Sequence, residues 1–473
     1  MRRLIFAILF WGFLKSADAQ PQQYVTFRID SAIKVAMTDH LIPGMQVVVS
    51  KYGLVLKKGK YGYANLEDRI DVTDSTMFSV SFMTKAFTCG AILLLMEDGK
   101  LNIDDPISKY LDSLPASWSG ISLRRLMNNT SGLQNDWDQD DVFFQMNNSD
   151  SAFLNNLKNS PLKFQPGEAF GYSCGAFVLG LVIEKVSGMS YADFMKQRIF
   201  DKLGMTYTTI NDPVRIIPNR AAGYILKNQQ LYNAHRMSAA AEGRGDIGVL
   251  ITVTDMLKWY NALQDSSLFQ KSSLELMFSP ALLNDSSRIS YGLGWFLNPY
   301  RDHAFISHGG SSKSGFNSVI EMYPEDHVVI IILCNRKSAD VRFLAKDIIG
   351  LFNKDYGRAS KMDKDPDLDS MRTMIHRHYF QDIGSQLDTG RKMMKALHMP
   401  AYLSDRESLA PYRDFTEFNF INSIRLKHPK PDLFGDIIQT VCLYEVKYAD
   451  KPTRYYSFLL DENNKIVFID HEE

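Results

Sequence analysis

The feature that most constrains this chain is the position of its β-rich runs, which lie at both ends of a long segment of helices and loops. Strands bury their apolar faces by pairing in one sheet, so runs from the two ends are expected to share a sheet. The sequence predicts an α+β fold, an antiparallel sheet flanked by helices and interrupted by a helical insertion. The predicted strands are Met45–Ser50, Leu54–Lys58, Ile289–Leu297, Ala304–Ser307, Phe316–Met322 and Val328–Cys334.

Helical spacing of apolar residues adds four elements to this frame. Arg28–His40 ends at an Ile-Pro-Gly turn, Asp255–Leu263 is a short amphipathic helix, and Ala339–Phe352 is a closing helix. Thr84–Leu95 is apolar almost all round, which is typical of a helix buried on every side. We therefore expect this helix in the middle of the structure.

The last quarter of the chain is predicted to form a separate domain. The charged, polar residues 354–369 predict a linker after a main domain of residues 20–353. Residues 370–473 show helical spacing through Leu397 and then strand-like runs at Gly435–Tyr448, Arg454–Leu460 and Ile466–Asp470. This element order predicts a small α+β domain with an antiparallel meander and resembles the NTF2-like cone folds.

The first 19 residues have the features of a signal peptide. Arg2 and Arg3 precede the apolar run Leu4–Leu14, and Ala17-Asp18-Ala19 forms a small-residue cleavage site before Gln20. The apolar run is too short to span a bilayer, so no stable membrane anchor is expected. The sequence predicts an exported protein, periplasmic or secreted.

Composition and cysteine spacing limit the kinds of partner and cofactor that are expected. The formal net charge of −1 gives no electrostatic reason to expect nucleic acid. Cys89, Cys174, Cys334 and Cys442 are scattered without metal-ligand spacing, and no nucleotide-binding loop occurs, so no metal or cofactor is expected. Cys89 and Cys334 lie in apolar runs and are expected in the core. No pattern in the sequence indicates an oligomeric state.

Six segments within about residues 30–353 together resemble the serine β-lactamase / penicillin-binding-protein family, in particular its class C-like and esterase-like branch. Their order and spacing carry the resemblance more than any one of them does. The segments are FSVSFMTKAFTCGAILLLMEDGKLNIDDPISKYL, LMNNTSGL, FQPGEAFGYSCGAFVLGLVIEKVSGMSYADFM, IFDKLGM, YGLGW and SHGGSSKSGF. The resemblance implies a beta-lactamase-related serine hydrolase that acts on a small-molecule or peptide-like acyl ligand.

The first segment implies a Ser-x-x-Lys site at the start of a helix. One helical turn separates the two residues, so both point into one cleft, and the helix start offers a backbone N–H to the oxyanion. The matching tetrad here is Phe82-Met83-Thr84-Lys85, in which the lysine is present and the serine is a phenylalanine. Ser81 shares a helix face with Lys85 and is a candidate substitute nucleophile; its simpler interpretation is a helix cap.

The second segment implies a Tyr-x-Asn site, which here reads Tyr172-Ser173-Cys174. By resemblance Tyr172 would relay a proton between nucleophile and leaving group. Cys174 replaces an amide that would contact the substrate, and a thiol is a weak donor and acceptor. A buried structural tyrosine is the alternative interpretation of Tyr172.

The last segment, His308-Gly309-Gly310-Ser311, matches the strand that lines the cleft. By resemblance the Ser311 N–H is the second oxyanion donor, and glycines at 309 and 310 allow a substrate backbone to approach. Asn129 is a further departure, because relatives commonly carry histidine there. We expect Lys85, Tyr172 and His308 to converge on one cleft with Phe82 at its floor, filling part of the acyl pocket.

Three interpretations follow. The first is a pseudoenzyme candidate, strongly impaired because Phe82 occupies the nucleophile position, that still binds a peptide, acyl or ester ligand. The second is an active serine hydrolase, of β-lactamase, D-alanyl peptidase or esterase type, acting through Ser81. The third is an interaction protein that works through its C-terminal domain.

Overall fold

The computed structural model describes residues 25–134, 149–300, 303–339, 341–353, 356, 373, 377, 415–431, 437–449, 453–462 and 466–472. Its longer helices are residues 25–39, α2 (Thr84–Glu97), α3 (Leu123–Met127), α5 (Asp150–Asn159), α6 (Gly175–Ser187), α7 (Tyr191–Met195), α8 (Ala239–Glu242), α9 (Val253–Gln264), α10 (Lys271–Met277) and α11 (Val341–Gly350). Short helical turns occur at η1 (Ser81–Met83), η2 (Ile107–Lys109), η3 (Ala116–Trp118) and η5 (Lys196–Phe200).

The strands form one large sheet and several small ones. The large sheet has the order β11-β12-β13-β1-β2-β3, with β11 (Ile306–Ser312), β12 (Phe316–Tyr323), β13 (Val328–Cys334), β1 (Gly44–Lys51), β2 (Leu54–Asn65) and β3 (Ile70–Asp71). The small sheets use β4 (Phe78–Ser79), β5 (Thr208–Ile210), β6 (Tyr224–Lys227), β7 (Gln230–Asn233), β8 (Val249–Ile251), β9 (Ala281–Leu282) and β10 (Arg288–Ile289).

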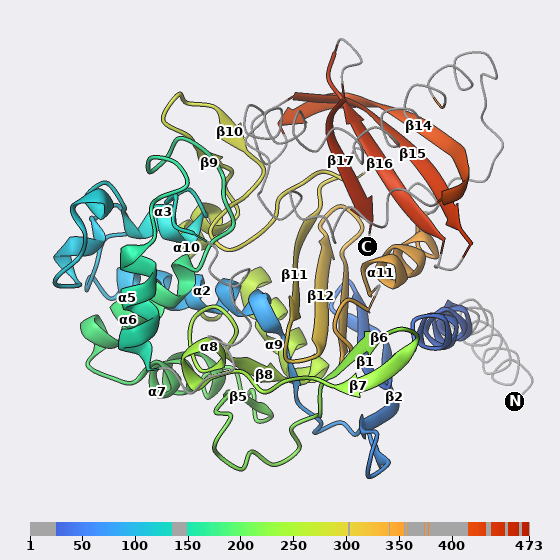
Figure 1. Cartoon of the computed structure of the whole chain (residues 1–473), viewed down its shortest axis with the longest axis horizontal. Helices are drawn as coiled ribbons and strands as arrows, with labels where there is room; N and C mark the ends of the chain where they lie inside the picture. The colour runs from blue at the N-terminus through green and yellow to red at the C-terminus, as the bar shows by residue number, and fades with distance from the viewer. Residues whose placement is uncertain are drawn as a thin grey trace, which may run out of the picture.

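The two chain ends meet in the large sheet. Strand β1 pairs antiparallel with β13, with Val47 opposite Ile332, and also with β2. The segment between β3 and β11 contributes the helices gathered on one side of the sheet (Figure 1). The predicted α+β architecture, with an antiparallel sheet and a helical insertion, is confirmed.

Both faces of the sheet are covered, as the alternation of its side chains requires. Val47 and Val49 pack in one cluster with Ile33 of the N-terminal helix and Ile348 of α11. Val48 faces the other way and belongs to the larger core around α2. The N-terminal helix and α11 lie together on the side away from the helical insertion (Figure 1).

Helix α2 occupies the centre of the larger core. Every residue from Thr84 to Leu95 is buried, so the helix has no solvent-facing stripe. Gly90 permits close packing of α2 on α9, because a β-carbon there would lie 2.8 Å from the Trp259 ring. The central position expected from the apolar sequence is confirmed.

Two predicted strands are wrong in extent. Residues 289–297 do not form one strand, because the chain turns back at Gly294, whose φ is +82°, and Tyr291 bridges to Phe296. Only Gly tolerates such a backbone without strain. The strand expected at Ala304–Ser307 is β11, which begins at Ile306 and continues through Ser312. Its glycines have low strand propensity and concealed the continuation.

The C-terminal part contains a four-stranded antiparallel sheet in the order β14-β15-β16-β17. Its strands are β14 (Phe415–Pro431), β15 (Ile437–Tyr448), β16 (Arg454–Leu460) and β17 (Ile466–Glu472). The expected meander of the last three strands is confirmed, and β14 was not predicted. The proposed linker, apart from Tyr356, and the predicted helical region up to Leu397, apart from two single residues, lie outside the described residues.

The described contacts between the C-terminal sheet and the main part of the chain include a hydrogen bond and an aromatic pair. The hydroxyl of Ser290 donates a hydrogen bond to the carbonyl of Pro431 in β14. The ring of Phe343 in α11 lies edge-on to that of Tyr455 in β16, with centroids 5.6 Å apart. The division into domains remains a prediction, as does the signal peptide, whose residues are not described.

The four cysteines are buried thiols, as expected for Cys89 and Cys334. Among the described residues, no helix is both long and apolar enough to cross a membrane.

Candidate functional site

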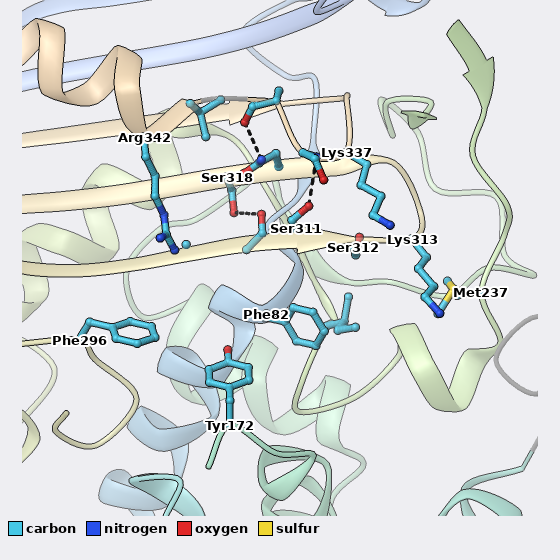
Figure 2. Close-up of a pocket in the computed structure, with 17 residues that line it drawn as sticks. Phe82, Tyr172, Met237, Phe296, Ser311, Ser312, Lys313, Ser318, Lys337 and Arg342 are labelled. Carbon is cyan, nitrogen blue, oxygen red and sulfur yellow. Dashed lines mark hydrogen bonds between the residues drawn. The ribbon is translucent and has the colours of Figure 1, made fainter. Parts of the chain in front are cut away.

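A cavity of about 580 Å³ opens where β11 and β12 meet the start of α2 and the start of α11. Figure 2 shows Phe82 and Tyr172 on one side of it and Ser311 and Arg342 on the other. No described residue beyond Arg342 lines it, so the described C-terminal sheet contributes none of its wall. The lining residues are Phe82, Tyr172, Met237, Ile247, Phe296, Gly309, Gly310, Ser311, Ser312, Lys313, Asn317, Ser318, Lys337, Ser338, Ala339, Val341 and Arg342.

Phe82 lies on the wall of this cavity. It sits in the short turn η1, directly before α2, and its half-buried ring packs on the main core. The ring meets that of Tyr172 edge-on with centroids 6.0 Å apart, a favourable aromatic geometry. The ring therefore occupies the cavity side of the position where the resemblance places a serine hydroxyl.

Lys85 lies behind the wall and not on it. Its residue exposure is 2%, and its ammonium lies 4.6 Å from the centre of the Tyr172 ring. The ammonium donates to the carbonyl of Ser173 at 2.5 Å and forms an ion pair with Asp246. All of these partners are protein groups, so the ammonium is satisfied without a ligand.

Asp246 is the partner of Lys85 that the sequence analysis did not identify. Its side chain is 1% exposed, and its second oxygen accepts the Phe177 N–H at 3.3 Å, near the start of α6. It thus joins the helix that carries Lys85 to the helix that follows Tyr172. The sequence signal for it is a carboxylate inside the glycine-rich stretch 243–248.

Tyr172 faces the cavity, and its ring also stacks on Phe296 with centroids 6.5 Å apart. Burial, and secondarily the neighbouring Tyr291, raises the pKa of the Tyr172 hydroxyl well above its ordinary value. At neutral pH the hydroxyl is therefore protonated and can act as a hydrogen-bond donor.

His308 is fully buried and does not line the cavity, which corrects the expectation that it converges there with Tyr172. Its Nδ1 lies 2.8 Å from the carbonyl of Gly309, and its ring packs edge-on against Phe296 at 5.7 Å. The Nδ1–H donates to that carbonyl, and Nε2 has no hydrogen-bond partner among the described residues. Burial lowers the pKa of His308 to about 3, so the imidazole is neutral.

Ser81 is also fully buried, and it neither lines the cavity nor caps the helix. Its hydroxyl donates to the Ser312 hydroxyl at 2.9 Å, on the side of β11. Its φ of +52° is a strained value for a residue with a β-carbon. The helix-cap interpretation is wrong, because the chain around Ser81 turns its hydroxyl toward the sheet.

The two glycines of β11 permit close approach by the protein itself. A β-carbon at Gly310 would lie 2.1 Å from the carbonyl oxygen of Val80 and 2.9 Å from the Phe82 nitrogen. A β-carbon at Gly309 would lie 2.9 Å from Nη2 of Arg342. Gly310 therefore lets β11 press against η1, and Gly309 makes room for a guanidinium in the cavity.

Two further positions lie outside the cavity wall. Cys174 is fully buried at the position before α6, so no described geometry gives it contact with a ligand in the cavity. Asn129 is buried with a φ of +57°, a value that asparagine tolerates better than most residues. Its burial and backbone conformation indicate a structural place.

The cavity has a distinct charge pattern. Lys313, Lys337 and Arg342 are the charged residues of its described lining, and that lining contains no acidic side chain. Figure 2 shows Arg342 reaching in from α11, on the opposite side from Tyr172. No group of three or more metal-ligating side chains occurs among the described residues.

Fold and motif spacing together identify the chain: it belongs to the Beta-lactamase family, whose sequence model matches residues 29–351. It is 29% identical over 312 residues to penicillin-binding protein 4* of Bacillus subtilis. The aligned region spans 62% of this chain and 68% of that protein. A structure of an octameric penicillin-binding protein homologue from Pyrococcus abyssi covers 92% of this chain and 96% of its own, with a TM-score of 0.61 and 20% identity. The match to a class C beta-lactamase structure covers 70% of this chain and 96% of that one, with a TM-score of 0.59 and 22% identity. These structures show the shared fold.

Proposed function

We propose that this protein is an exported, catalytically impaired member of the family that binds a peptide, acyl or ester ligand in the cavity beside Phe82. The observation that carries the proposal is the Phe82 ring, which lines the cavity at the nucleophile position. Acyl transfer needs an attacking atom held close to its base. A benzyl side chain offers no such atom.

The surrounding groups support this proposal. The Lys85 ammonium is held by Asp246 and the Ser173 carbonyl. The Tyr172 hydroxyl keeps its proton, because its pKa is raised. Lys85 and Tyr172, the groups expected to transfer the proton, both lie close to residue 82, whose side chain has no hydroxyl for them to activate. The alternative of an active hydrolase would require Ser81 to leave its bond to Ser312 and turn into the cavity.

The lining indicates the ligand's chemistry. Phe82, Tyr172 and Phe296 offer aromatic surface, and Lys313, Lys337 and Arg342 offer positive charge. Aromatic walls bury an apolar acyl group, and guanidinium and ammonium groups favour an anion. An acyl compound that carries a carboxylate satisfies both features.

Covalent labelling tests the proposal. The full-length mature protein is treated with a fluorophosphonate probe and with a fluorescent penicillin, and intact mass is measured. We expect no adduct on the unmodified protein, and reversible binding of the penicillin measured by anisotropy. A stoichiometric adduct on any serine would refute the non-catalytic interpretation, and loss of that adduct in Ser81→Ala would establish the alternative.

Two substitutions at position 82 distinguish the effect of removing the ring from the effect of adding a nucleophile. Phe82→Ala removes the ring without adding a nucleophile, and Phe82→Ser removes it and supplies one. We expect only Phe82→Ser to form an adduct and to hydrolyse a chromogenic β-lactam or a short p-nitrophenyl ester. Phe82→Ser/Lys85→Ala is the control against contaminating hydrolases. Equal labelling of Phe82→Ala and Phe82→Ser would refute the role assigned to position 82.

Export is a separate part of the proposal. The charged start, the apolar run and the small-residue site before Gln20 support it. Expression in a Gram-negative host followed by N-terminal sequencing of the periplasmic fraction should give a chain beginning at Gln20. A full-length chain retained in the cytoplasm would contradict this prediction.

A further inference from the structure

A second cavity, of about 440 Å³, lies beside β4, β8 and the loop that joins β11 to β12. It shares none of its described lining residues with the cavity beside Phe82. Its charged or titratable side chains come from four separate segments of the chain. They are Glu67, Arg220, His235, Arg236 and Glu242.

The acidic side of this cavity is Glu242, the last residue of α8, which is 5% exposed. Its carboxylate accepts a hydrogen bond from the side-chain amide of Asn211 at 3.1 Å. Burial raises the pKa of Glu242 to about 7, against the opposing effects of Ser314 and Arg220. A buried carboxyl poised in this range gains from a cationic partner.

The basic side consists of Arg220 and Arg236. Nη1 of Arg220 donates to the Asn211 side-chain oxygen at 3.1 Å and to the Asp212 carbonyl at 2.9 Å. Its other two nitrogens donate to no described residue, and Arg236 forms no hydrogen bond or ion pair within the described chain. Burial, and secondarily the charge of Arg236, lowers the pKa of Arg220, so an anion between the two guanidinium groups would relieve their repulsion.

The side chain of Asn211 spans the two sides. Its oxygen faces Arg220 and its amide nitrogen faces Glu242. One side-chain amide therefore bridges Arg220 and Glu242, and no direct ion pair between them occurs among the described residues. A ligand that fits beside Asn211 needs the same polarity, with an acceptor toward the arginines and a donor toward the carboxylate.

We propose that this second cavity binds a small zwitterion of the α-amino-acid class, with its carboxylate on Arg220 and Arg236 and its ammonium on Glu242. A simple anion would meet the Glu242 carboxylate, and a simple cation would meet two guanidinium groups. Only a ligand with both charges pairs with both sides of the cavity. The proposal does not depend on the function assigned to the cavity beside Phe82.

Calorimetric titration of the mature protein with L-alanine and D-alanine tests the proposal, with propionate and ethylamine as probes that each carry one of the two charges. We expect saturable binding of at least one alanine enantiomer, and binding at least tenfold weaker for propionate and ethylamine. Phe82→Ala is the control, because it alters the other cavity and should leave alanine affinity unchanged. No saturable binding of either enantiomer overturns the proposal, and so does equal binding of propionate.

Two variants locate the binding. Arg236 is exposed, so Arg236→Gln should fold normally and weaken alanine binding about tenfold through loss of a charge-assisted hydrogen bond. Glu242→Gln keeps the shape and removes the negative charge, and should weaken binding similarly. Because the ammonium favours ionised Glu242, affinity should rise from about pH 6 to about pH 8 in the unmodified protein and stay flat in Glu242→Gln. Affinity that falls over this range, or that survives both substitutions, overturns the assignment.

Discussion

The ion pair between Lys85 and Asp246 permits a quantitative test of how the site is held together. Their side chains are 3% and 1% exposed, so water cannot replace either partner when the other is lost. Asp246→Asn removes the charge and keeps an oxygen for the Phe177 N–H. Breaking a buried pair in this way costs about 3–5 kcal/mol, because the remaining charge is left in a low-dielectric interior. We expect the free energy of unfolding to fall by that amount.

Urea unfolding followed by circular dichroism measures the change, with an unchanged m-value as the check that compactness is preserved. The double variant Lys85→Met/Asp246→Asn should recover most of the loss, because no uncompensated charge remains. Asp98→Asn is the matched control: its pair with Arg198 is 30% exposed on each side and should cost no more than about 1 kcal/mol. If Asp246→Asn costs no more than this control, or if the double variant is no more stable than Asp246→Asn, the reasoning is refuted.

Two buried groups should give opposite dependences of stability on pH. The pKa of Glu242 is raised from 4.5 to about 7, so its contribution is present below pH 4.5 and is lost as pH rises through 7. The difference in unfolding free energy between the unmodified protein and Glu242→Gln should therefore change by about 3 kcal/mol from about pH 4 to about pH 8, and a flat difference would contradict the shift. The pKa of His308 is lowered from 6.5 to about 3, so its contribution is present above pH 6.5 and is lost as pH falls through 3. Over that range the free energy of unfolding of His308→Gln should fall by up to about 5 kcal/mol less than that of the unmodified protein. An unchanged acid-unfolding midpoint would count against the buried neutral imidazole.

The large sheet and its central helix could be predicted because their signals are local. Val328–Cys334 is a continuous β-branched run bounded by turns, and its predicted limits match β13. Thr84–Leu95 is long and apolar enough that only a buried helix satisfies it. The strand at residues 289–297 failed because Gly294 reverses the chain inside an otherwise strand-like run.

Only those site residues that belong to a spaced motif could be located from the sequence. The register that places Phe82 one helical turn before Lys85 follows from the sequence; Phe82 lines the cavity, and Lys85 lies buried behind its wall. Asp246 could not be found in this way, because it lies 161 residues from Lys85 and pairs with it only after the helices assemble. The burial of His308 was missed for a similar reason: Phe296, which covers it, lies in the segment whose strand was wrongly predicted.

The two neighbouring glycines of β11 provide the sharpest test of how the cavity is shaped. A methyl group at Gly310 would lie 2.1 Å from the Val80 carbonyl oxygen, a backbone atom that cannot rotate away. A methyl group at Gly309 would meet only the end of the Arg342 side chain at 2.9 Å, and that side chain can move. Gly310→Ala should therefore cost about 1–3 kcal/mol or more through forced displacement of β11 from η1, and Gly309→Ala much less. Displacement of β11 also separates Ser311 from Phe82, so Gly310→Ala should abolish reversible penicillin binding while Gly309→Ala reduces it only modestly. Chemical unfolding and fluorescence anisotropy measure the two effects, and equal behaviour of the two variants would show that contact with η1 does not set the shape of the cavity.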